Sequence, residues 1–227
     1  DNHFIQAPLK ENMPVLMALI GLWNRNFIDC STLAVLPYSE KLSLLPAYLQ
    51  QLEMESNGKG IDLEGNEITD YQTNPVLFGE AGTNGQHSFY QLIHQGRQTI
   101  PCDFIGVVKP EHNLDNHHEI LMNHMLAQGQ ALMRGRLKPE NPHRYFAGNK
   151  PSTTILLNNL NAHSLGMLIA LYEHKVFVQG VIWNVNSFDQ FGVELGKEMT
   201  KTIENTEKSN IDPTIQGLYS RIHKTTK

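Results

Sequence analysis

The chain has 227 residues, of which 40% are hydrophobic and 18% are charged. This composition is ordinary for a globular protein, and the length suffices for one large domain with a substantial core. The 18 basic and 23 acidic side chains give a formal net charge of −5. Such a charge lacks the positive excess that would attract nucleic acid or an anionic membrane, so we expect neither as a partner.

Hydrophobic periodicity and turn residues predict helices alternating with strands. In chain order, the pattern predicts a helix over 13–27, a strand over 31–36, a helix over 39–54, a short strand over 76–78, a turn over 82–85, a helix over 86–94, a strand over 100–108, a helix over 115–134, a strand over 153–158, a helix over 162–174, a helix starting near 189 and a short helix over 214–223. Pro46 requires a kink or a new start in the second helix, and 176–183 fits a strand or a continued helix. This alternation indicates an α/β sandwich with a largely parallel sheet.

Cysteine and histidine positions do not indicate a metal site. Cys30 and Cys102 are the only cysteines, and each lies beside an apolar run without metal-ligand spacing. We expect two buried, reduced thiols in a cytoplasmic protein. His117 and His118 point in different directions on a helix, and together with His124 they lack a carboxylate partner at a suitable spacing.

The stretch from Gly180 to Lys197 places polar residues where amphipathicity does not require them. It contains the motif F-D-Q-x-G-V-E-x-x-K, which resembles the C-terminal motif of the glucose-6-phosphate isomerase family. Two further blocks, 51–59 and 79–96, are similar to blocks of the same family in the same order, and 101–104 and 172–175 support them. The resemblance covers about 13–204 and weakens in the tail.

The resemblance implies a three-layer α/β/α sandwich of the sugar isomerase (SIS) type, with a five-stranded, largely parallel sheet. We expect this domain over 1–204, followed by a polar linker and helical tail over 205–227. The family's Ser/Thr-rich phosphate loop and Gly-Gly-Arg motif have no counterpart here, so we expect a C-terminal part of a larger enzyme that is inactive alone. The 136–148 connection is shorter than in many family members.

Aldose–ketose isomerisation needs a base that carries a proton between adjacent carbons through an enediol. Glu55 matches the family's catalytic glutamate, whereas its near neighbour Glu53 is offset from that position. Leu52 and Met54 are expected to supply apolar surroundings that raise the pKa of the base. Gln51 lies one helical turn before Glu55 and matches a substrate-binding glutamine, with a surface amide as the alternative.

Three further residues match functional positions of the family. His87 follows a glycine-bearing turn and would assist ring opening, reaching into the site of the other subunit; a capping or core histidine is the alternative. Lys197 would contact the ring oxygen or an adjacent hydroxyl and stabilise negative charge. Gln190, seven residues earlier, is expected on the same side of one helix and would line the substrate site.

The resemblance therefore implies an enzyme that interconverts glucose 6-phosphate and fructose 6-phosphate in glycolysis and gluconeogenesis, without metal or redox cofactor. The complete enzyme is expected to be a homodimer. Two alternatives stay open: a non-catalytic sugar-phosphate-binding or interaction module of the same fold, and an isomerase of another phosphosugar such as mannose 6-phosphate.

Overall fold

The computed structural model describes residues 1–110, 112–138, 140–207 and 210–224. Contacts divide the chain into two compact units, Asp1–Phe188 and Asp189–Lys227. The sequence instead placed a boundary between 204 and 205. Each unit is described by itself below.

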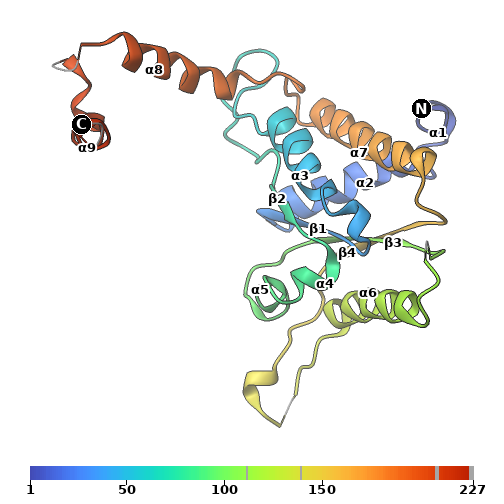
Figure 1. Ribbon diagram of the computed structural model, residues 1–227. Coiled ribbons are helices and arrows are strands. Elements are labelled where there is room, and N and C mark those ends of the chain that lie inside the picture. Colours follow the sequence, from blue (N-terminus) through green and yellow to red (C-terminus); the bar gives the residue numbers. More distant parts are fainter. Residues whose placement is uncertain (111, 139, 208–209, 225–227) are drawn as a thin grey trace. The chain divides into compact units, whose positions relative to one another are not determined.

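The first unit alternates helices with strands, much as the periodicity predicts (Figure 1). Its elements are α1 (Asn2–Gln6), α2 (Met13–Leu22), the π-helix η1 (Trp23–Phe27), β1 (Thr32–Pro37), the 3₁₀-helix η2 (Glu40–Leu42), α3 (Leu45–Gln50), the π-helix η3 (Gln51–Glu55), β2 (Val76–Gly79), α4 (Gly82–Gly85), α5 (Tyr90–Gln95), β3 (Cys102–Val107), α6 (His117–Arg134), the 3₁₀-helix η4 (Pro142–Arg144), β4 (Ser152–Leu157) and α7 (Ala162–Ile182).

The four strands are all parallel and follow the order β2-β1-β3-β4. The resemblance implied five strands, and within the described residues this number is wrong. The ambiguous stretch 176–183 continues α7 instead of adding a strand. Its buried residues repeat at helical spacing with those before them: Leu168, Tyr172, Val176 and Gln179.

Strand side chains alternate between two helical layers. Ala34, Leu36, Cys102 and Phe104 face a cluster with α5 and α6. Their strand neighbours, which include Val35 and Ile105, face a second cluster with α2, α3 and α7. Figure 1 shows the two layers on opposite faces of the sheet, with α4, α5 and α6 on one side and α2, α3 and α7 on the other. The three-layer α/β/α architecture is therefore confirmed.

Local signals fix several element boundaries. The Asn12 side chain accepts a hydrogen bond from the Val15 backbone and caps α2. Pro46 lies in the first turn of α3, so the second predicted helix does start afresh there. Arg136 pairs with Phe146 across the short 136–148 connection. The starts of α2 and α3 depend only on residues close to them in sequence, so the sequence pattern locates both starts well.

α7 has the length and apolar composition of a membrane-crossing helix. Its buried side chains, however, pack in the core of the first unit with β1 and β3. It also carries a buried cation, Lys175. These contacts are those of a core helix of an α/β sandwich.

The second unit contains the 3₁₀-helix η5 (Phe191–Val193), α8 (Glu194–Asn205) and α9 (Pro213–Lys224). The predicted helix start near 189 is wrong, because α8 begins at Glu194 and no side chain caps it. Gln190, with φ −136° and ψ 31°, lies outside helical geometry, and Phe191–Val193 after it form the 3₁₀-helix η5. Gln190 thus precedes the helix, and the expected two-turn spacing between Gln190 and Lys197 on one helix does not exist.

Candidate active site

Glu55 ends the π-helix η3, which continues α3 by one wider turn. Its side chain is half-buried, and Gln51 at the start of the same turn is exposed. Leu52 and Met54, expected to surround Glu55, pack against the α2, α3 and α7 cluster. The turn therefore anchors its apolar side chains in the core and leaves Glu55 and Gln51 in contact with solvent.

A buried ion pair lies inside this turn. The Lys175 ammonium of α7 donates to both carboxylate oxygens of Glu53, at 2.7 and 2.8 Å. Neither residue is more than 2% exposed. The family motif marks Glu53 only as a near neighbour of Glu55 and does not indicate this pair. The available signal was the spacing of Lys175, seven residues after Leu168 and three after Tyr172, which puts it on the core face of α7.

The residues after Glu55 are also held by α7 and its C-terminal extension. The Asn57 amide donates to the carbonyl of Val176 at 2.8 Å, and the Ser187 hydroxyl donates to the Asn57 amide oxygen. Lys59 donates to the backbone carbonyl of Glu55 at 3.1 Å. Side chains on both sides of Glu55 are thereby bound to α7, that of Glu53 to Lys175 and that of Asn57 to the carbonyl of Val176.

His87 lies in the turn between α4 and α5 and is exposed. The turn is anchored at the end of β1, where the Tyr38 hydroxyl is 3.2 Å from the Tyr90 hydroxyl and accepts a hydrogen bond from Gln86. A Cβ atom at Gly82 would overlap the Tyr38 ring, so the close approach of α4 requires glycine there. The expected glycine-bearing turn is thus a short helix that presents His87 to solvent.

Within the first unit, α4 and α5, which flank His87 in the chain, lie on the opposite side of the sheet from α3, which runs into the turn with Glu55 (Figure 1). Phe89 and Tyr90, close to His87 in the chain, pack in the α5 and α6 cluster. Leu52 and Met54, beside Glu55, pack in the α2, α3 and α7 cluster. One copy of this unit therefore does not bring the two candidate catalytic side chains together.

Gln190 and Lys197 belong to the second unit, and both are exposed. Lys197 lies in the first turn of α8, together with Glu194. Its expected role beside Glu55 and His87 stays a prediction, as does that of Gln190.

A second buried carboxylate lies near the ion pair. Asp103 of β3 is 6% exposed and accepts a hydrogen bond from the Tyr172 hydroxyl at 3.1 Å. Burial raises the pKa of Asp103 to about 6, while the nearby Lys175 cation opposes this rise. Burial likewise raises the pKa of Tyr172. Both charges of the ion pair therefore influence this carboxyl group, because Lys175 lowers the pKa of Asp103 and Glu53 raises it.

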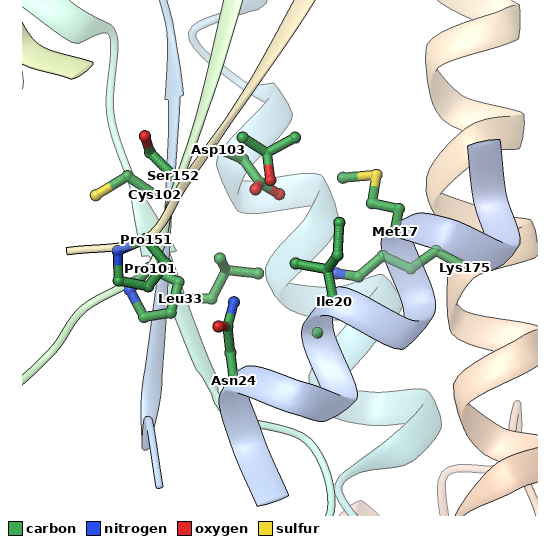
Figure 2. Close-up of a pocket in the computed structure, with 12 residues that line it drawn as sticks. Met17, Ile20, Asn24, Leu33, Pro101, Cys102, Asp103, Pro151, Ser152 and Lys175 are labelled. Carbon is green, nitrogen blue, oxygen red and sulfur yellow. The ribbon is translucent and has the colours of Figure 1, made fainter. Parts of the chain in front are cut away.

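A cavity of about 100 Å³ opens beside Asp103 and Lys175, at the ends where β1, β3 and β4 begin (Figure 2). It is lined by Met17, Ile20, Gly21, Asn24, Leu33, Pro101, Cys102, Asp103, Pro151, Ser152, Thr153 and Lys175. This small cavity lies apart from Gln51 and Glu55, neither of which lines it.

Cys30 and Cys102 are free and buried, as predicted. Burial raises the pKa of both thiols, that of Cys102 to about 12. In the part of the chain that the structure describes, no three His, Cys, Asp or Glu side chains group as metal ligands would.

Comparison with known proteins agrees with this arrangement of motifs. The family model described as phosphoglucose isomerase matches residues 1–218. The chain is 53% identical to a glucose-6-phosphate isomerase of Deinococcus radiodurans, over 95% of this chain and 42% of that protein. It is 51% identical to glucose-6-phosphate isomerase 1 of Chromohalobacter salexigens, over 99% of this chain and 41% of that protein.

Solved structures show the same likeness. A glucose-6-phosphate isomerase from Chlamydia trachomatis superposes with a TM-score of 0.87 at 40% identity, over 99% of this chain and 44% of that one. A hypothetical protein from Thermus thermophilus shares the fold, with a TM-score of 0.73 at 24% identity, over 90% of this chain and 48% of that one. The chain spans about two fifths of the length of the curated relatives it matches.

Proposed function

The chain belongs to the phosphoglucose isomerase family, and we propose that it forms the C-terminal part of a cytoplasmic glucose-6-phosphate isomerase. This enzyme interconverts glucose 6-phosphate and fructose 6-phosphate. The observation that carries the proposal is the 53% identity over nearly the whole chain. The two buried free thiols support the cytoplasmic location.

Glu55 is the proposed base. Moving a proton between C1 and C2 of the sugar requires a carboxylate that reaches the substrate and is held in one orientation. Glu55 is half-buried, and side chains on both sides of it are bound to α7. Gln51, on the same turn, is proposed to bind substrate hydroxyls.

His87 is proposed to act in the active site of a second subunit. Its turn lies on the face of the sheet opposite Glu55, and its side chain is exposed. An imidazole can both donate and accept protons on sugar oxygens near neutral pH, which suits ring opening. A homodimer would allow Glu55 of one subunit and His87 of the other to serve one substrate. Lys197 is proposed to stabilise negative charge on the substrate, and Gln190 is proposed to bind substrate.

The test compares Glu55→Gln with the matched control Glu119→Gln, an exposed carboxylate on α6. In the complete enzyme, Glu55→Gln is expected to lower kcat by roughly 10²–10⁴-fold, because it removes the base and preserves the side-chain shape. Calorimetric binding of the sugar phosphate should persist. Retention of more than about a tenth of the wild-type kcat would contradict the assignment. A wild-type protein that binds sugar phosphate without turnover would favour the non-catalytic module.

A further inference from the structure

The π-helix η3 contains two glutamates that are only two residues apart. Glu53 is fully buried, whereas Glu55 is half-buried and reaches solvent. A π-turn is rare and inserts an extra residue into the helical path, which redirects the side chains that follow it. The direction of the Glu55 carboxylate therefore depends on how firmly this irregular turn is held.

Two successive residues of α7 hold the turn from both sides of Glu55. Lys175 binds both carboxylate oxygens of Glu53, two residues before Glu55. The carbonyl of Val176 accepts the amide of Asn57, two residues after Glu55. Because Lys175 and Val176 are adjacent on one long helix, the two attachments share a single rigid support.

The chemistry of the first attachment indicates positioning more than stability. A buried ion pair gains little net stability over apolar side chains of similar volume, because both charges lose their hydration. It does impose a defined geometry, since an ammonium between two carboxylate oxygens has few alternative arrangements in a dry interior. Neighbouring residues of the turn, Leu52 and Met54, already supply the apolar packing.

We propose that the Glu53–Lys175 ion pair and the Asn57–Val176 hydrogen bond act together as a positioning device that sets the Glu55 carboxylate for proton transfer. Glu53, Lys175 and Asn57 are then positioning residues, since none of them needs to touch the sugar. This inference rests on the proposed function, because it assumes that Glu55 is the base.

The main test removes both charges of the pair together in the complete enzyme, as Glu53→Gln with Lys175→Met, so that neither partner remains as a buried charge without the other. A displacement of about 1 Å at a catalytic group can cost about 10²-fold in rate. We therefore expect kcat to fall at least about tenfold, with KM within about twofold of wild type, since substrate contacts stay intact. Tyr172→Phe, one turn away on the same face of α7, is the control and should keep wild-type kcat.

A double variant that melts cooperatively and keeps the wild-type kcat overturns the inference. If the double variant does not fold, the Asn57→Ala variant tests the inference instead. It removes the hydrogen bond to Val176 and leaves the ion pair in place. A lowered kcat at unchanged KM supports positioning, and a wild-type kcat overturns it. Glu55→Gln in the same assay separates the two proposals: an active Glu55→Gln enzyme refutes the assigned base, whatever the positioning variants do.

Discussion

The buried carboxyl group of Asp103 makes the stability of the first unit depend on pH. Its folded-state pKa is raised to about 6 from the ordinary 3.8, chiefly by burial, with Lys175 opposing and Glu53 adding to the rise. A raised pKa means that the folded state binds the proton more tightly than the unfolded state does. The resulting stabilisation is fully present below pH 3.8 and is lost as the pH rises through about 6.

The size of this effect follows from the two pKa values. A pKa difference of about two, at about 1.4 kcal/mol for each tenfold change in the proton equilibrium, corresponds to about 3 kcal/mol. Asp103→Asn removes the ionisation and keeps an oxygen that can accept the hydrogen bond from Tyr172. The stability of the variant relative to wild type should therefore rise by about 2 kcal/mol between pH 4 and pH 8, because at pH 4 the unfolded-state carboxyl group is already about half ionised.

Urea unfolding at a series of pH values would measure this difference for wild type, Asp103→Asn and the control Asp115→Asn. The control removes an exposed carboxyl group in the loop before α6. It reports how the loss of a solvated carboxylate alone affects the curves. A constant difference between Asp103→Asn and wild type across the series would refute the reasoning about burial. A difference that falls with rising pH would show that attraction to Lys175 outweighs desolvation.

Two further predictions concern the candidate site. Mixing inactive His87→Ala with inactive Glu55→Gln complete enzyme should restore some isomerase activity, because mixed dimers hold one site with both groups intact. If no activity returns after confirmed subunit exchange, both residues act in the site of one subunit. Gly82→Ala should lower the melting temperature, because the added Cβ overlaps the Tyr38 ring. The control Gly166→Ala places its Cβ in open space on α7 and should leave the melting temperature unchanged or raise it. An unchanged melting temperature for Gly82→Ala would contradict the steric argument.

The sequence by itself determined most of the local structure. Asn12 and Pro14 start α2, Pro46 restarts the second helix at α3, and the apolar runs form the four parallel strands. These features depend on propensities and capping groups within a few residues, so a single chain reveals them. The motif around Glu55 could likewise be recognised in the sequence, and the comparisons confirm the family that it resembles.

The tertiary structure decided what distant residues do to one another. Glu53 and Lys175 are 122 positions apart, so only the folded chain shows that they form a buried pair. Packing determined the secondary structure of 176–183, because the sequence of a short apolar run is compatible with either a strand or a helix. α8 starts only at Glu194 because Gln190, with φ −136° and ψ 31°, lies outside helical geometry and Phe191–Val193 form a 3₁₀-helix. Burial and charge pairing depend on residues from the whole chain, so the periodicity of one segment does not predict them.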